Sequence, residues 1–205
     1  MIDHLVYGTR DVEATVAELE RLTGVRAAPG GRHPGRGTRN ALLGLGHGRY
    51  LEIIGPDPLQ SGTTSPLPFG LDYLTGPRLV TWAARADDLE KRIASARAAG
   101  YDPGDILPRS RERPDGRTLK WRLTSLGLDH PDWLVPFLID WQRSQHPSDS
   151  APAGLTLVEL RATHPEPDHI RRILAALGVD LPIARGSRGS LLAKLETPRG
   201  RVDLD

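Results

Sequence analysis

Two residues of this sequence, His4 and Glu52, have the chemistry and the setting expected of an active site. Each lies in a short, mainly apolar segment, IDHLVYG and YLEII, that is typical of a β-strand. Because side chains alternate between the two faces of a strand, each shares a face with apolar neighbours. A carboxylate on such a face is costly to bury unless it is paired or bound to a cation. An imidazole and a carboxylate on neighbouring strands are suitable ligands for Zn, Ni, Mn or Fe, so the pair is a candidate metal site with Glu52 as its catalytic residue.

Simpler explanations of this pair stay open. His4 and Glu52 could hydrogen-bond to each other, or Glu52 could face solvent. No spacing rule connects the two residues, and two protein ligands alone hold a catalytic metal poorly. The candidates for a third ligand, none of them supported by spacing, are Asp140, His33 and His130.

A glycine-rich segment, GGRHPGRGTRN, precedes the strands around Glu52 and carries three candidate ligand-binding residues: His33, Arg39 and Asn40. Glycine tolerates positive φ angles and lets a ligand approach the backbone closely. The segment is not a phosphate-binding loop, because no helix follows it and no Lys-Ser/Thr pair is present. The alternative is a structured turn in which Asn40 bonds to the loop backbone.

Tryptophans supply a second group of ligand-binding candidates. The chain has four Trp but only two Phe, and Trp82, Trp121 and Trp141 fall within expected strands. Indoles that face a cavity offer flat apolar surfaces with one hydrogen-bond donor each, whereas packing between helix and sheet is the alternative. Asp140 is a further candidate, although a register shift of one residue would place Ile139 on the inner face in its stead.

The elements that must position these residues follow one order, strand, helix and then further strands. In residues 1–58 a strand is expected at 2–8. Val12, Val16, Leu19 and Leu22 recur at helical spacing after the N-cap candidate Asp11. Gly24 ends this helix, and strands are expected near 25–28, at 41–45 and at 50–54.

The same order recurs in residues 78–141 and again in residues 155–205. In the second copy, strand 79–84 leads to a helix with Asp87 as its N-cap and Gly100 at its end, followed by strands 119–123 and 135–141. Such a repeat of one βαβββ unit is the main feature of the chain, although βα units are common enough to recur by coincidence. The intervening residues 59–77 and 142–154 are rich in Pro, Ser, Gly and Thr and are predicted to be connecting loops.

Composition excludes several classes of function. With 27 Lys and Arg against 26 Asp and Glu, the net charge of +1 gives no bulk electrostatic affinity for nucleic acid or anionic membranes. The absence of cysteine excludes disulfides and thiol catalysis. No apolar run approaches the roughly 20 residues of a membrane span, and the N-terminus has no signal-peptide pattern. We therefore expect a soluble, cytoplasmic protein of one sizeable domain or two small ones.

The tandem βαβββ order, the DHLVYGT start and the YLEII strand together resemble the vicinal oxygen chelate superfamily, which includes glyoxalase I, extradiol dioxygenases and bleomycin-resistance proteins. The segment from Gly30 to Pro58, and PFLIDW followed by His146-Pro147, are similar to glyoxalase-like domain proteins of bacteria. The resemblance implies an α+β fold in which two βαβββ modules form a cup-shaped mixed β-sheet flanked by helices. We expect the third copy, residues 155–205, to pack beside the cup or at a subunit interface. Family members commonly build their cups across dimers, which implies a homodimer.

In metal-dependent members of the superfamily, each module supplies a His on its first strand and a Glu on its fourth strand. His4 and Glu52 fall on these positions in the first module. In the second module the matching positions hold Val80 or Thr81, neither of which is a ligand. The resemblance therefore implies half of the family's metal site, and lactoylglutathione chemistry is not expected.

Two functions follow from the resemblance. The first is a metal-dependent lyase, isomerase or dioxygenase that acts on a small organic molecule in the cup. The second is a metal-free protein that binds such a molecule, as drug-sequestering relatives do. A scaffold whose cup is filled by its own side chains is a third alternative.

Overall fold

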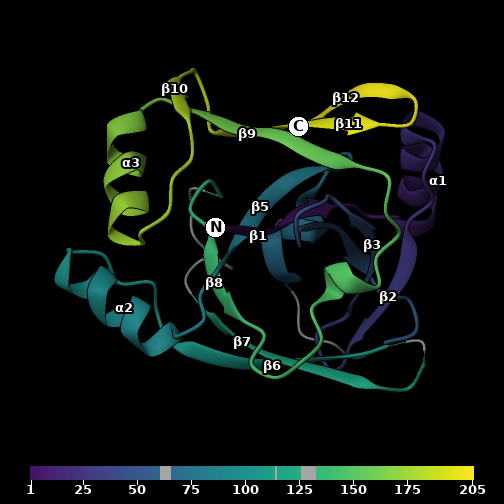
Figure 1. Ribbon diagram of the computed structural model, residues 1–205, viewed down its shortest axis with the longest axis horizontal. Coiled ribbons are helices and arrows are strands. Elements are labelled where there is room, and N and C mark those ends of the chain that lie inside the picture. The colour runs from purple at the N-terminus through teal and green to yellow at the C-terminus, as the bar shows by residue number, and fades with distance from the viewer. Residues whose placement is uncertain (61–65, 114, 126–132) are drawn as a thin grey trace.

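The computed structural model describes residues 1–60, 66–113, 115–125 and 133–205. In these residues the chain forms a closed β-barrel and a separate four-stranded sheet, with helices on the outside (Figure 1). This arrangement confirms the predicted α+β class with a cup-shaped sheet flanked by helices. The division of the chain into three modules stays a prediction.

The first half of the barrel comes from the N-terminal part of the chain. Its elements are β1 (Ile2–Gly8), α1 (Val12–Thr23), β2 (Ala28–His33), β3 (Thr38–Gly44) and β4 (Tyr50–Pro56). Helix α1 begins after Asp11, whose side chain accepts a hydrogen bond from the backbone N of Ala14 at 3.0 Å. It ends at Gly24, which has the left-handed φ of 79° that a C-cap glycine supplies.

The second half follows after the short 3₁₀ helix η1 (Pro68–Tyr73). Its elements are β5 (Arg78–Arg85), α2 (Leu89–Ala98), β6 (Ile106–Glu112), β7 (Thr118–Thr124) and β8 (Phe137–Asp140). The N-cap of α2 is Asp88 and not the predicted Asp87, because the Asp88 side chain accepts the hydrogen bond from Lys91 N. The sequence does not predict β6, because ILPRSRE combines a proline with three charged residues; this strand forms through its pairing with β7.

The strands of the barrel follow the order β1-β4-β3-β2-β6-β7-β8-β5. The two halves meet along β1 and β5, which are antiparallel, and again where β2 pairs with β6 at Arg32 and Glu112. At this second seam a Cβ on Gly31 would lie 2.0 Å from the carbonyl O of Glu112, and Gly31 has a φ of 139°. The glycine-rich segment therefore includes a residue that closure of the barrel requires.

Strand alternation divides the buried residues into two cores. Val6, Tyr50 and Ile54 belong to the core inside the barrel, whereas Leu5 and Leu51 belong to the core between the barrel, the helices and the second sheet. Because both faces of β1 and β4 are covered, their segments are mainly apolar on both sides. A polar side chain on an inner position of these strands therefore faces the interior of the barrel.

The C-terminal part of the chain forms the second sheet, which lies against the outside of the barrel (Figure 1). Its elements are β9 (Thr156–His164), α3 (Pro167–Ala176), β10 (Ile183–Arg185), β11 (Ser190–Thr197) and β12 (Gly200–Leu204), in the sheet order β10-β9-β11-β12. It is fixed to the barrel by backbone hydrogen bonds from Leu157 N to Leu45 O and from Leu79 N to Asp205 O. A short 3₁₀ helix, η3 (Pro147–Asp149), lies in the segment that leads to it.

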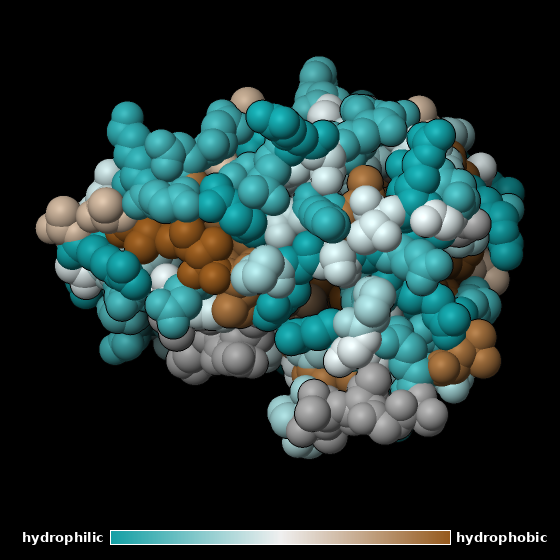
Figure 2. Space-filling model, turned by 90° about the horizontal axis from the view of Figure 1, so that it is seen from below, coloured by the Kyte–Doolittle hydropathy of each residue, from teal (hydrophilic) through white to brown (hydrophobic). Residues whose placement is uncertain are grey.

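The surface seen from below is mostly hydrophilic, with hydrophobic side chains exposed in separate patches (Figure 2). Among the described residues, no helix has both the length and the apolar character needed to cross a membrane.

Candidate functional site

The barrel contains a cavity that opens to solvent at its mouth. Much of its lining is apolar and comes from Phe69, Trp121, Leu123, Phe137, Ile139 and Trp141. The ionisable side chains in the lining, apart from Tyr50, are His4, His33, Arg36, Glu52, Arg109 and Arg111. The cavity thus joins a wide apolar surface to a small group of polar residues from distant parts of the chain.

Glu52 points into this cavity from β4, so the alternative of a solvent-facing carboxylate is wrong. Its Oε1 accepts a hydrogen bond from Asn40 Nδ2, which comes from β3. Its Oε2 lies 3.7 Å from His4 Nε2, too far for a hydrogen bond. One carboxylate oxygen is therefore held by the protein, and the other is left for a ligand.

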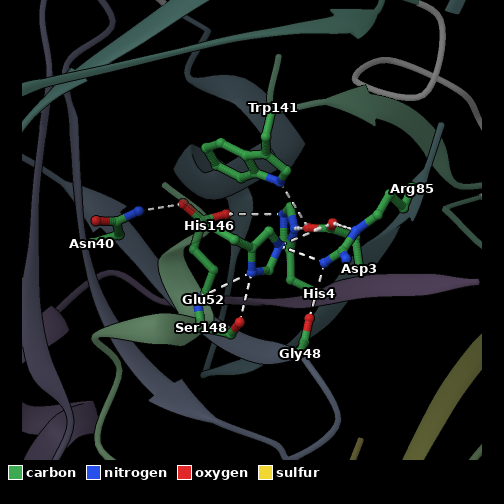
Figure 3. A network of polar contacts seen from close by, with 9 residues as sticks. All are labelled: Asp3, His4, Asn40, Gly48, Glu52, Arg85, Trp141, His146 and Ser148. Atoms are coloured by element: carbon green, nitrogen blue, oxygen red, sulfur yellow. Dashed lines mark hydrogen bonds and ion pairs between the residues drawn. The ribbon is translucent and has the colours of Figure 1, made fainter. Parts of the chain in front are cut away.

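His4 is oriented by its neighbour Asp3, a residue that sequence reasoning missed (Figure 3). Regular alternation would turn these two side chains to opposite faces, but the pairing of β1 with β5 shifts register between Ile2 and His4. Such an irregularity re-aims a side chain. His4 Nδ1 lies 2.8 Å from Asp3 Oδ1. This contact directs the other ring nitrogen, Nε2, toward Glu52.

Asp3 is fully buried and is the centre of a polar network. Besides His4, it accepts hydrogen bonds from Trp141 Nε1 at 3.2 Å and Arg85 Nε at 2.8 Å, and it lies 3.1 Å from His146 Nε2. Burial alone would raise the pKa of Asp3, but the hydrogen bonds from His146 and His4 outweigh it and hold the pKa well below its usual range. The carboxylate stays ionised and links the first half of the barrel to the second.

His33, at the end of β2, approaches Glu52 from another side. Its Nδ1 lies 2.9 Å from Thr38 Oγ1, and its Nε2 lies 3.8 Å from Glu52 Oε1. Burial lowers the pKa of His33 to about 4, against the opposing effect of Glu52, so the imidazole is neutral at pH 7. His33 therefore adds no positive charge to the cavity at neutral pH.

Three arginines that the sequence analysis did not select also line the cavity: Arg36, Arg109 and Arg111. Arg111 is only 4% exposed, and its Nη1 donates to Asn40 Oδ1 at 3.1 Å. Two of the three lie on β6, whose segment PRSRE places Arg109 and Arg111 two residues apart and hence on one face of a strand. That spacing was the available signal, but it has meaning only when the segment is known to be a strand.

Of the predicted ligand-binding residues, the structure brings His33, Asn40, Trp121 and Trp141 to the cavity or its polar group. The rings of Trp121 and Trp141 lie 5.2 Å apart, which gives a broad indole surface. His33, Asn40 and Trp121 lie on β2, β3 and β7, and Trp141 directly follows β8. Because these strands belong to both halves of the barrel, the four residues come together only when the barrel closes.

The other three predicted ligand-binding residues, Trp82, Arg39 and Asp140, do not line the cavity. Trp82 is buried in the outer core, and its Nε1 donates to a backbone carbonyl 2.9 Å away. Arg39 is paired with Glu13 of α1, and Asp140 with Arg122 at 2.7 Å. Strand alternation turns all three away from the interior, so a ligand-binding role in the cup does not fit this geometry.

The second half of the barrel offers no counterpart to the His4–Glu52 pair. Strand β1 pairs with β4, and β5 with β8, in the same parallel manner. The hydrogen bond from Ala86 N to Ile139 O in the second half corresponds to that from Thr9 N to Ile54 O in the first, which places Thr81 at the position of His4 and Phe137 at the position of Glu52. Neither is a histidine or a carboxylate, so the donors present do not fit the four-ligand site that the resemblance implies.

Of the two predicted matches for His4, Thr81 agrees with this register and Val80 does not. His130, a candidate third ligand, lies outside the described residues. Among the residues that are described, no three His, Cys, Asp or Glu side chains are grouped so that they could hold a metal ion.

Comparison with known proteins gives one family and several structures. A family model described as a glyoxalase-like domain matches residues 2–178. A crystal structure of a hypothetical protein from Staphylococcus aureus has a TM-score of 0.66 and 12% identity, and the match covers 100% of this chain and 85% of that one. This likeness shows a shared fold.

Two further structures are less similar. A methylmalonyl-CoA epimerase of Streptomyces coelicolor, in complex with 2-nitronate-propionyl-CoA, has a TM-score of 0.47 and 19% identity over 71% of this chain and 96% of that one. The epimerase from Mycobacterium tuberculosis has a TM-score of 0.45 and 16% identity over 68% and 86%. Among curated proteins there is no match.

Proposed function

The chain belongs to the glyoxalase-like domain family, within the vicinal oxygen chelate superfamily, and from this premise we propose that its barrel cavity binds a small organic molecule from which Glu52 accepts a proton. The observation that carries the proposal is the state of the Glu52 carboxylate. Asn40 holds Oε1, while Oε2 faces the cavity without a hydrogen bond to the described residues. A positioned carboxylate beside an apolar surface is suited to general base catalysis.

The residues around the cavity would have separate roles in this reaction. The indoles of Trp121 and Trp141 would hold the apolar body of the molecule and exclude water. Glu52 Oε2 would accept a proton from a carbon next to a carbonyl group. The C–H bond breaks, its electron pair stays on the ligand as an enolate, and Glu52 becomes a neutral carboxyl that can return the proton.

A metal-dependent reaction is the competing proposal. The Asp3–His4 hydrogen bond favours it, because a carboxylate commonly orients a metal-binding histidine in this way. Against it stand Thr81 and Phe137 at the positions of the second ligand pair. Elemental analysis of protein purified without chelators decides between the two, since a stoichiometric bound ion would favour the competing proposal.

Proton exchange into phenylpyruvate tests the role of Glu52. This probe combines an aromatic ring with acidic methylene hydrogens next to a carbonyl group. We expect the protein to accelerate exchange of these hydrogens in D₂O, as followed by proton NMR, and Glu52→Gln to slow the catalysed exchange by about 100-fold or more. Calorimetric affinity for the probe should change little. Equal exchange rates in the two proteins would overturn the proposal.

If phenylpyruvate binds but its hydrogens do not exchange, the protein binds small molecules without turnover, as the drug-sequestering members of the superfamily do. The homodimer, the cytoplasmic location and the lack of a nucleic-acid partner stay predictions. Light scattering of the purified protein tests the first of these.

A further inference from the structure

We propose that Arg111, assisted by Arg109 and Arg36 at the same cavity, is an anion subsite that selects ligands with a carboxylate group. The inference rests on the proposed function and deepens it by naming the class of ligand. It would make the bound molecule an organic acid whose apolar body lies against the indoles.

The first observation is that the buried guanidinium of Arg111 has few partners. The residue is 4% exposed, and the hydrogen bond from Nη1 to Asn40 Oδ1 is its one side-chain hydrogen bond in the described residues. Its Nε is buried and has no partner there. A guanidinium has five N–H donors, and a buried donor without an acceptor is costly.

The second observation is that Arg111 forms no ion pair with a carboxylate of the described residues. Glu52 is the nearest in the network, but Asn40 stands between them, donating to Glu52 and accepting from Arg111. Burial lowers the pKa of Arg111, as expected for a cation whose lost hydration is not replaced. A ligand carboxylate would supply the missing charge and acceptors.

Two other arginines of the chain are each paired with a carboxylate. Arg85 is paired with Asp3 at 2.8 Å, and Arg32 with Asp57 at 2.7 Å. The three arginines at the cavity differ from these two, because Arg109 donates only to the adjacent carbonyl of Pro108, and Arg36 has no carboxylate partner in the described part of the chain.

The cavity accordingly carries an excess of positive charge. Among the described residues that line it, Glu52 is the one carboxylate, and it stands against three guanidinium groups while His33 is neutral. Low-dielectric walls focus such a field and raise the local concentration of anions. The charge excess remains even with Glu52 ionised.

The glycine-rich segment provides the space for this subsite. A Cβ on Gly30 would lie 2.3 Å from Asn40 Oδ1 and 3.0 Å from Arg111 Nη1. Any side chain at this position would therefore displace the Asn40–Arg111 contact. Gly30 thus allows the subsite to form, while the adjacent Gly31 lies at the seam between β2 and β6.

Two probes of similar shape test the proposal. Phenylpyruvate carries a carboxylate, and phenylacetone has a methyl group in its place. By titration calorimetry we expect the protein to bind phenylpyruvate at least about tenfold more tightly, because charge-assisted hydrogen bonds contribute that much or more. Arg111→Gln should abolish this preference and leave the affinity for phenylacetone unchanged.

Control variants make the result specific. Arg97→Gln removes an exposed arginine on α2, and it should keep the preference of the unchanged protein. If Arg111→Gln does not fold, Arg111→Lys serves instead. It keeps the charge but lacks the planar fork, so the preference should fall several-fold.

Each outcome separates the two proposals. Equal affinity for both probes, or a preference that survives Arg111→Gln, would overturn the anion subsite while leaving the cavity as a binding site. A preference lost in Arg111→Gln without Glu52-dependent exchange would uphold the subsite and overturn the proton transfer. Phenyl phosphate serves as a third probe, and tighter binding of it than of phenylpyruvate would overturn selection for a carboxylate. If the protein binds neither phenylpyruvate nor phenylacetone, both proposals are overturned.

Discussion

In the first half of the barrel, β1 and β4 turn His4 and Glu52 into the cavity, whereas the matching positions of β5 and β8 hold Thr81 and Phe137. The two halves share one topology and one register, yet they supply different chemistry. The first half provides the carboxylate and the imidazoles, and the second provides most of the apolar wall and the two arginines of β6. A repeated fold can thus form one asymmetric site in which each half has a separate task.

The two tasks meet at Asn40. Its amide nitrogen donates to Glu52, and its amide oxygen accepts from Arg111, so the negative and positive groups of the cavity are held apart by one side chain. A direct ion pair would neutralise both groups. The arrangement leaves the carboxylate able to accept a proton and the guanidinium able to bind an anion.

The largest expected effect concerns the contact between the halves. Asp3 joins His4 of the first half to Arg85 and Trp141 of the second. We expect Asp3→Asn to lower the free energy of unfolding by about 4 kcal/mol, because it removes one partner of a buried charge network. Urea unfolding followed by circular dichroism measures the loss.

The exposed carboxylate of Asp102 gives the matched control, and Asp102→Asn should have little effect. The sign of the pH dependence follows from the lowered pKa of Asp3. Its stabilisation is present at neutral pH and is lost as the pH falls below the unfolded carboxyl value of about 4. A loss in Asp3→Asn no greater than in the control would mean that the halves are joined by packing alone.

The next effect tests the neutral imidazole of the first half. Because burial lowers the pKa of His33 to about 4, an unfolded chain binds a proton at this residue between pH 6.5 and 4, and the folded chain does not. Stability should therefore fall by about 3 kcal/mol from this residue as the pH drops through that window. Urea unfolding across the window should show a flatter pH profile for His33→Gln than for the unchanged protein, and identical profiles would contradict a neutral His33.

A double variant would make the two halves alike. Thr81→His with Phe137→Glu supplies the ligand pair that the second half lacks. We expect the double variant to bind Co²⁺ about 100-fold more tightly than the unchanged protein, as seen by visible absorption of the bound ion. Phe137→Glu alone is the control and should give a smaller gain. No gain in the double variant would contradict the matching of the two registers.

The smallest effect separates the inner from the outer indoles. Trp141 and Trp82 each donate one hydrogen bond, but only Trp141 lines the cavity. Trp141→Phe and Trp82→Phe should each lower stability by about 1 kcal/mol. Phenylpyruvate should still change the fluorescence of Trp82→Phe, and the change should be reduced in Trp141→Phe. The reverse result would place the ligand outside the barrel.

The residues of the site could be predicted from the sequence in part. His4 and Glu52 stood out because each is a polar residue in an apolar strand, and both do face the cavity. Arg111 could not be found, because its strand is half-buried, contains proline and shows no apolar alternation. Asp3 was missed for another reason, since a shift in the pairing of β1 turns it toward His4.

The sequence by itself determined the elements with strong local signals. The apolar strands, the N-cap Asp11, the helix end at Gly24 and the α+β class all follow from residue type and short-range spacing. These features depend on a few neighbouring residues, so local patterns are enough to predict them.

Only the tertiary structure decided which polar groups share one cavity. Whether Ile139 or Asp140 faces inward depends on strand register, and register is set by pairing between distant segments. The same is true of Phe137, which takes the place of a second glutamate, and of Arg111, which reaches Asn40 only because β6 pairs with β2. Closure of the barrel brings these residues together, and no local pattern encodes it.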